Sequence, residues 1–365
     1  MPSSSPVNAG NRRLSWKSRV LLVGFGVLMA TVLVEAGLRV TDAIRERRAN
    51  VGWGADRTPT SEYWAIYDPD LGYRQNPKFP EMNAEGLRDR AIGPKGDRFR
   101  VLFMGDSVAV YGDSVDDTFV GHLRTSLHAN PSFEKVDVIN AGIKGYTNYQ
   151  EVLFLKKFGL GFKPDLVGFE FCLNDLFKFL HSFEVENGQL VSGTYGFATQ
   201  AVAKRQESSG IVRLAKQSRL LVWLRNNLSV ARNAAEWGAT QGFSFDHRMD
   251  VRNAWDDEPW RAIERQLAEA VTLGQTHGFP VFVVAFPLAA QYTPDYLAKD
   301  REYVLKPQAK LREICERLEI PYYDIYPELE ARDFSNDGLH LNAEGRVRAG
   351  RAVSEFLTRS GLLLK

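Results

Sequence analysis

Five short apolar runs, separated by segments with helical periodicity, constrain the fold of this chain more than any other feature. The segments 118–129, 148–158 and 260–277 repeat apolar residues every three or four positions, as a helix with one buried face requires. Strands that are apolar throughout are typical of a parallel sheet with helices on both faces. The alternation therefore predicts an α/β fold with a central five-stranded parallel sheet. Its strands are expected at Phe99–Met104, Val136–Ile139, Leu166–Phe171, Pro280–Phe286 and Pro321–Tyr326.

The overall composition excludes two classes of protein. The 365 residues include 46 Lys and Arg against 45 Asp and Glu, and 44% of the residues are hydrophobic. This balance excludes a disordered chain, which has low hydrophobicity and high net charge, and a basic surface for nucleic acid over the whole chain. Nucleic acid is therefore not an expected partner.

The cysteines and the glycine motifs give no sign of a metal or a cofactor. Cys172 and Cys315 cannot form a disulfide framework and have no metal-ligand spacing with a histidine, so each is interpreted as a small buried apolar residue. No GxGxxG motif follows a predicted strand, and the sequence has no P-loop and no histidine cluster. We therefore expect a site without metal or cofactor.

The N-terminus departs from the average composition. Residues 1–19 contain four basic residues and no acidic one, and Val20–Val34 is a run of fifteen uncharged residues. At about 1.5 Å per residue this run spans about 23 Å, and its extension to residue 40 approaches the roughly 30 Å of a bilayer core. Residues 1–19 are therefore interpreted as a basic cytoplasmic leader and residues 20–40 as a transmembrane anchor.

Two interpretations of this segment stay open. It is either an uncleaved anchor or a secretory signal that is cut after Val34-Glu35-Ala36. We favour the anchor because the apolar pattern continues past this triplet at Leu38, Val40 and Ile44. In both cases the positive-inside rule places the following residues outside the cytoplasm. The expected location is the inner membrane, crossed once, with the folded domain on the periplasmic side.

The rest of the chain is divided by composition. Residues 41–82 are polar and rich in turn residues and are interpreted as a tether and lead-in to a domain at 83–365. The interval 176–259 breaks the alternation and is interpreted as an insertion. It contains a hairpin signal at Asn187-Gly188, and then an apolar and basic stretch at 211–231 that is expected to be helical. The basic face of this stretch would contact anionic lipid or an acidic polymer, or would simply be solvated.

A serine follows the first predicted strand, where an open α/β sheet binds its ligands. It is Ser107, in the sequence Gly105-Asp106-Ser107. A second copy of this tripeptide, Gly112-Asp113-Ser114, follows a loop and precedes a helix, so we assign it a structural role. Ser107 is therefore the serine that is placed to present its Oγ to a cleft.

Other candidate residues follow the other strands. Gly142 lets the backbone approach a ligand, so that its N–H can donate to an oxyanion, and Asn174 offers a side-chain amide. Asp337 and His340 are three residues apart, so the carboxylate can fix the imidazole tautomer and leave the other nitrogen for a serine. Each residue has an ordinary alternative role, such as a helix cap or a turn. Their common position after predicted strands favours an active site.

These motifs, in this order, resemble the sequence blocks of the SGNH or GDSL-type hydrolases. The blocks are Gly105-Asp106-Ser107, Gly142, Asn174-Asp175 and Asp337-x-x-His340, and the resemblance covers roughly residues 83–365. The segments NAEGLRDR and NAGIKGY are similar to those of a bacterial, membrane-anchored branch of this family. The resemblance implies a flavodoxin-like three-layer fold and ester hydrolysis without a metal.

The resemblance also implies a role for each residue. Ser107 would be the nucleophile, His340 the general base and then the acid, and Asp337 the orienting carboxylate. The oxyanion hole would consist of the backbone N–H groups of Ser107 and Gly142 with the side chain of Asn174. The sequence departs from the family at Cys172, where a glycine is usual, and a thiol there could narrow the pocket or alter the substrate range.

The expected function is that of a serine esterase acting on an acyl or acetyl ester in the cell envelope. An O-acyltransferase that modifies an extracellular polysaccharide would use the same residues, and a carbohydrate-binding scaffold with an inactive triad is a third alternative. The expected partners are an ester-bearing small molecule or glycan, and the membrane through residues 20–40. The acyl group, the acceptor and the oligomeric state stay open.

Overall fold

The structure, a computed structural model, describes residues 15–49, 64–186, 189–198, 202–204, 218, 220–221, 242–248 and 250–363. The chain divides into two compact units. One consists of residues 1–56 with 206–238, and the other of residues 57–205 with 239–365.

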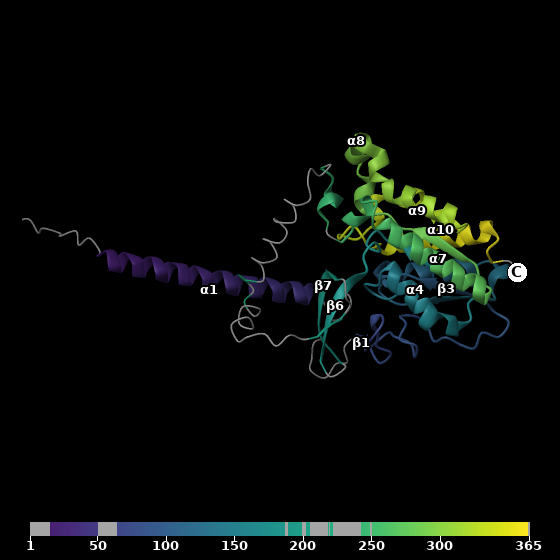
Figure 1. The fold of residues 1–365 in the computed structure, drawn as a ribbon, viewed down its shortest axis with the longest axis horizontal. Coiled ribbons are helices and arrows are strands. Elements are labelled where there is room, and N and C mark those ends of the chain that lie inside the picture. Colours follow the sequence, from purple (N-terminus) through teal and green to yellow (C-terminus); the bar gives the residue numbers. More distant parts are fainter. Residues whose placement is uncertain are drawn as a thin grey trace, which may run out of the picture. The chain divides into compact units, whose positions relative to one another are not determined.

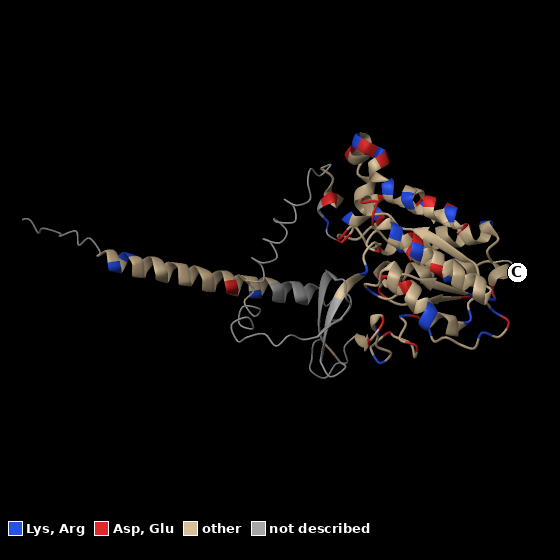
Figure 2. Ribbon diagram, viewed as in Figure 1, with Lys and Arg blue, Asp and Glu red and all other residues tan. Residues whose placement is uncertain are grey.

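The first unit contains one long helix, α1 (Trp16–Ala49). Its residues Trp16–Thr41 are apolar and numerous enough to cross a membrane, and the most apolar window is not buried in the protein. Figure 2 shows few charged residues along this helix between its basic start and the pair Glu35–Arg39, whose side chains lie 2.8 Å apart. The carboxylate of Glu35 also accepts hydrogen bonds from Ser218 Oγ at 3.1 Å and Leu220 N at 2.8 Å. The helix is consistent with both a signal anchor and a signal peptide, and it runs without a break through residues 34–36.

The second unit is built around a five-stranded sheet in which every pair of neighbouring strands is parallel (Figure 1). The strand order is β10-β9-β5-β3-β4, the order of a flavodoxin-like doubly wound sheet. The predicted α/β class and sheet are thus confirmed, with strand ends that differ by at most two residues. The strands are β3 (Phe99–Met104), β4 (Val136–Asn140), β5 (Leu166–Phe171), β9 (Val281–Ala285) and β10 (Tyr322–Asp324).

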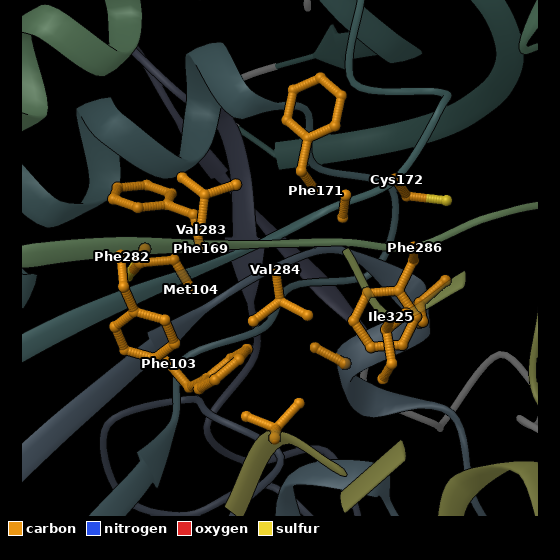
Figure 3. Close-up of a cluster of buried hydrophobic side chains, with 14 of the residues drawn as sticks. Phe103, Met104, Phe169, Phe171, Cys172, Phe282, Val283, Val284, Phe286 and Ile325 are labelled. Carbon is orange, nitrogen blue, oxygen red and sulfur yellow. The ribbon is translucent and has the colours of Figure 1, made fainter. Parts of the chain in front are cut away.

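Helices cover both faces of this sheet and form the outer layers. On one face α3 (Phe119–His128) packs against α10 (Ala343–Ser360), and on the other α4 (Asn148–Lys157) packs against α7 (Trp260–His277). Figure 3 shows Phe103 and Phe282 on one side of the strands and Phe171 on the other. The Phe103 ring lies 5.5 Å from that of Phe119 in α3, and the Phe171 ring lies 5.7 Å from that of Trp260 in α7.

Local sequence signals explain where these helices begin and end. The Thr118 side chain accepts a hydrogen bond from Gly121 N at the start of α3, and Asn342 does the same for Gly345 N at the start of α10. Helix α7 ends at His277 and is capped by Gly278, whose φ of 80° favours glycine. The other α-helices among the described residues are α2 (Ser107–Val110), α8 (Pro294–Val304) and α9 (Lys306–Arg317). Short 3-10 helices are η1 (Pro131–Phe133), η2 (Gly159–Phe162), η3 (Ser244–His247), η4 (Arg252–Trp255), η5 (Ala289–Tyr292), η6 (Tyr326–Glu328) and η7 (Ala331–Asp333).

The segment before the sheet was expected to be a tether and lead-in. From residue 64 onward it contains regular secondary structure. Strands β1 (Ala65–Asp68) and β2 (Gly72–Gln75) pair as an antiparallel hairpin. Tyr73 is fully buried, its hydroxyl donates to the carbonyl of Lys144 at 2.7 Å, and its own carbonyl accepts from the Tyr146 hydroxyl at 2.6 Å. Part of the expected lead-in therefore packs into the folded domain, and residues 50–63 lie outside the described residues.

The described part of the expected insertion contains three strands in addition to the 3-10 helices η3 and η4. Strands β6 (Phe179–Glu186), β7 (Gln189–Ala198) and β8 (Val202–Lys204) form a sheet in the order β7-β6-β8. The predicted hairpin is confirmed because β6 and β7 pair antiparallel, with Glu186 opposite Gln189. The stretch 211–231 and the two hairpin residues lie outside the described residues, apart from Ser218, Leu220 and Leu221.

Candidate active site

The candidate residues gather where the strand order reverses. Strands β3 and β5 are neighbours in the sheet, although β4 lies between them in the sequence and pairs with the other side of β3. Such a reversal leaves a crevice at the carboxyl ends of the strands, where doubly wound folds bind ligands. Ser107 follows β3 and Asn174 follows β5, so this topology brings the two residues to the same crevice.

Asp106 organises the turn that carries Ser107. Its buried carboxylate accepts hydrogen bonds from Val108 N at 2.7 Å, which caps α2, and from the Asn174 side-chain amide at 2.8 Å. A Cβ on Gly105 would lie 2.8 Å from Ala109 Cβ and 2.8 Å from a carboxylate oxygen of Glu170, so only glycine fits there. Helix α2 has only four residues, and its dipole therefore contributes little at Ser107.

Ser107, His340 and Asp337 form a continuous chain of hydrogen bonds. His340 Nε2 lies 2.8 Å from Ser107 Oγ, and His340 Nδ1 lies 2.6 Å from Asp337 Oδ2. The second carboxylate oxygen of Asp337 accepts from the backbone N–H groups of Leu339 at 2.9 Å and His340 at 3.0 Å. The spacing of three residues thus places the carboxylate beside the imidazole, and the imidazole beside a serine more than two hundred residues earlier in the chain.

The hydrogen bonds at Asp337 keep it ionised. Partial burial alone would raise its pKa, but the bonds from the His340 ring and from the two backbone N–H groups outweigh burial and lower the pKa to about 2. An ionised carboxylate at this position holds the proton of His340 on Nδ1 and leaves Nε2 free to accept a proton from the serine hydroxyl.

The two other predicted oxyanion donors, Asn174 and Gly142, lie close to the turn that carries Ser107. Each of them already donates a hydrogen bond to another group. Asn174 is buried, and one of its amide hydrogens goes to Asp106 Oδ2. The N–H of Gly142 donates to the side-chain oxygen of Asn140 at 3.1 Å. A Cβ on Gly142 would lie 2.7 Å from Ala109 Cβ, so this residue packs tightly against α2. The structure therefore brings both residues to the turn that carries Ser107, but gives the Gly142 N–H a partner of its own.

Two residues that were not predicted from the sequence contact the Asp337–His340 pair. The Tyr111 ring stacks on the His340 ring with centroids 4.6 Å apart and planes 23° apart. Arg248 donates from Nη1 to the carbonyl of Asp337 at 2.9 Å and is held by Asp250 through a 2.6 Å ion pair. The position of Tyr111 four residues after Ser107 is a signal that could have been used, whereas nothing in the local sequence links Arg248 to Asp337.

Both cysteines are buried, as expected from the sequence. Cys172 is 1% exposed, and burial raises the pKa of its thiol well above the usual range. Its backbone N–H donates to Asp175 Oδ2 at 2.7 Å. The Cys172 thiol therefore lies inside the protein. Among the described residues, no cluster of His, Cys, Asp and Glu side chains could hold a metal ion.

A pocket opens beside the residues that follow Asn174. Its volume is about 680 Å³, and its lining includes Tyr149 of α4, Phe177 and Lys178 after β5, and Arg265 of α7. The ammonium group of Lys178 lies 5.2 Å from the centre of the Tyr149 ring. The pocket thus combines aromatic and charged side chains at the carboxyl end of β5.

Known proteins provide an independent comparison with this site. The model of the GDSL-like Lipase/Acylhydrolase family matches residues 103–347, a range that contains Ser107, Asn174, Asp337 and His340. No curated protein sequence matches the chain.

Solved structures with similar folds include TesA, Axe2 and Est24. TesA is 14% identical, with 71% of this chain and 98% of TesA covered and a TM-score of 0.42. Axe2, an acetylxylan esterase from Geobacillus stearothermophilus, is 13% identical, with 71% and 93% covered and a TM-score of 0.41. Est24, a carbohydrate acetylesterase from Sinorhizobium meliloti, is 14% identical, with 72% and 100% covered and a TM-score of 0.40.

The family match extends from the first strand of the sheet into the last helix and so covers more than half of the chain. The chain therefore belongs to the GDSL-like lipase/acylhydrolase family, also known as the SGNH hydrolases.

Proposed function

We propose that this protein is a serine esterase that hydrolyses an acyl or acetyl ester carried by a small molecule or a glycan of the cell envelope. The observation that carries this proposal is the chain of hydrogen bonds from Asp337 through His340 to Ser107. A serine hydroxyl is a weak nucleophile at neutral pH, and a neutral imidazole at 2.8 Å is the base that activates it.

In the proposed mechanism, Ser107 Oγ attacks the ester carbonyl while its proton passes to His340 Nε2. The imidazolium then donates this proton to the oxygen of the leaving alcohol, and the ester C–O bond breaks. Water repeats the sequence on the acyl-enzyme and releases the acid. Asp337 stabilises the imidazolium in both steps without accepting its proton.

The oxyanion formed in each step needs donors, and Asn174 is best placed to provide one. An amide carries two N–H groups, and Asp106 uses only one of those of Asn174, which fixes the direction of the other. The backbone N–H of Ser107 is a second donor. Gly142 can contribute only by sharing its N–H with Asn140, so we expect its contribution to be the smallest of the three.

The test is turnover of a short-chain aryl acetate by the purified full-length protein. Ser107→Ala should abolish turnover, and Asn174→Ala should lower kcat by about 10²- to 10³-fold, as loss of one oxyanion donor does. Ser114→Ala is the matched control: this serine, in the second Gly-Asp-Ser copy, accepts a hydrogen bond from Asp117 N and should leave kcat unchanged. Full activity in Ser107→Ala would overturn the proposed function.

We also propose that α1 anchors the protein in the inner membrane, with the esterase domain in the periplasm. The apolar helix Trp16–Thr41, preceded by a basic and acid-free leader, supports this location. An esterase held there would meet esters of the envelope and not those of the cytoplasm.

A further inference from the structure

Behind the turn that carries Ser107 lie four fully buried carboxyl groups. They belong to Asp106, Glu151, Glu170 and Asp175, and each residue is 0% exposed. Among the described residues, none of the four forms an ion pair within 4.0 Å. Ionised carboxylates without a cation are costly inside a protein, so such a group must bind a proton or be rich in hydrogen bonds.

Asp106 belongs to the Gly-Asp-Ser turn itself, and Glu170 touches this turn from β5. Its Oε2 accepts a hydrogen bond from the backbone N–H of Asp106 at 3.2 Å. The same oxygen would be 2.8 Å from a Cβ on Gly105, so the turn packs closely against this carboxyl group. Strand β5 thus supports the residue before the nucleophile as well as carrying Asn174 beyond its end.

Full burial without a cation beside it favours the neutral acid form of Glu170. Burial raises its pKa well above the usual range, and the neighbouring carboxyl groups of Asp106 and Asp175 raise it further. A neutral carboxylic acid has one O–H donor as well as an acceptor oxygen. Its Oε1 has no other hydrogen-bond partner among the described residues, and a bond to the Asp106 side chain, which two carboxyl groups can form only when one of them carries a proton, raises the pKa of Glu170 as well.

Asp106 in turn holds the amide of Asn174. The bond from Asn174 Nδ2 to Asp106 Oδ2 is 2.8 Å, and the other oxygen of Asp106 accepts from Val108 N. A rotation of the Asp106 carboxylate would therefore move the donor that we assign to the oxyanion.

We propose that Glu170 is a positioning residue: as a carboxylic acid it accepts from the Asp106 backbone and donates to the Asp106 carboxylate, and so fixes the Asn174 amide for the transition state. This inference rests on the proposed esterase function. It predicts that the acid form of the side chain, and not its negative charge, is what the enzyme needs.

The test compares two substitutions of Glu170 in the full-length protein. Glu170→Gln has the shape of the neutral acid, with an N–H to donate and an oxygen to accept, and should keep kcat within about threefold of the wild type. Glu170→Leu removes both groups. It should lower kcat with little change in KM, by at most the roughly 10²- to 10³-fold of losing the oxyanion donor itself.

A double substitution separates positioning from a general effect on folding. If Glu170 acts through Asn174, then Glu170→Leu should cost almost nothing further in kcat when Asn174→Ala is already present. Gln308→Leu is the matched control, because it removes a buried polar side chain in α9 and should leave kcat unchanged. If Glu170→Leu does not fold, Glu170→Met is compared in the same way.

Three results would overturn the inference, given that the wild type is active and that its activity requires Ser107. One is a Glu170→Gln variant as slow as Glu170→Leu, and another is an equal loss of kcat with and without Asn174. The third is a Glu170→Leu variant, or Glu170→Met in its place, that folds and keeps full kcat. If the wild type does not turn over the ester at all, the proposed esterase function is wrong, and so is this inference, which depends on it.

Discussion

The imidazole of His340 is fixed by contacts on its edge and on its face. Asp337 and Ser107 bind its two nitrogens, and the Tyr111 ring stacks against its plane at a centroid distance of 4.6 Å. Arg346 lies beside the Tyr111 ring, with its guanidinium 5.9 Å from the ring centre. The same guanidinium donates a hydrogen bond to the carbonyl of Asp117 at 2.7 Å. The ring that must accept and return a proton therefore has little freedom to rotate.

Replacing Tyr111 should slow turnover without weakening substrate binding. An aromatic ring face favours a neighbouring cation, and His340 is a cation only after it has taken the serine proton. Tyr111→Ala should therefore lower kcat about fivefold, which corresponds to about 1 kcal/mol, with a smaller change in KM. The measurement is steady-state turnover of the aryl acetate.

Tyr111→Phe is the control for this prediction, because it keeps the ring and loses the hydroxyl. It should match the wild type. A Phe variant as slow as the Ala variant would show that the hydroxyl, and not the stacked ring, is what matters.

At the level of helices and strands, the spacing of apolar residues in the sequence predicted the ends of an element well wherever that element has a long buried face. Helix α7 has the predicted bounds, and β3 and β5 have the predicted ends. The hairpin β1–β2 was not predictable, since its four-residue strands depend on Tyr73 and on its bonds to residues 144 and 146, far along the chain.

The same distinction applies to the candidate site. The position of Ser107, His340 and Asp337 after strands or near a helix start is readable in the sequence, and the fold brings these residues into contact. Arg248 and Glu170 are different, because they act on backbone groups more than sixty residues away in the chain. Only the packing of one element on another reveals such contacts.

Helix α4 brings a buried acid toward the end of the sheet. Glu151 lies in its first turn, and neither of its carboxyl oxygens has a hydrogen-bond partner among the described residues. Burial raises the pKa of Glu151 well above its usual range, and the nearby carboxyl groups of Glu170 and Asp106 raise it further. Folding therefore keeps a proton on Glu151 that the unfolded chain would release above about pH 4.3.

Because Glu151 binds this proton only in the folded state, its contribution to the free energy of unfolding of the wild type falls as the pH rises. The folded state binds more protons than the unfolded state between the unfolded and the folded pKa, so the contribution of Glu151 to the free energy of unfolding decreases there, by up to about 1.4 kcal/mol per pH unit. Glu151→Gln cannot ionise, so its stability relative to the wild type should increase as the pH rises from about 5 toward the raised pKa of the folded state. Urea unfolding at several pH values measures the difference, with the exposed Glu85→Gln as the control. A difference that does not change with pH would contradict the prediction.

At the scale of the whole molecule, the charge balance of the chain hides two units with different compositions. One contains α1, whose apolar side chains are exposed in the described structure, and the other contains the sheet and the candidate site. Leu28, for example, is 60% exposed. Exposed side chains of this kind along most of a helix need an apolar environment, which a bilayer provides.

The anchor and the cleaved signal differ in where the mature chain begins and in where it is found. We expect the full-length chain with a C-terminal tag to stay with the membranes after a carbonate wash and to retain the segment around residue 35. Cleavage after Ala36 would instead give a soluble periplasmic protein that begins at Gly37, and would contradict the anchor. Leu28→Arg places a charge in the middle of the apolar run at a cost of about 2.5–3.5 kcal/mol, so it should reduce the membrane fraction, whereas Leu28→Ala should not. Because the sheet and the Ser107–His340–Asp337 chain belong to the other unit, both variants should keep the turnover of the wild type in detergent.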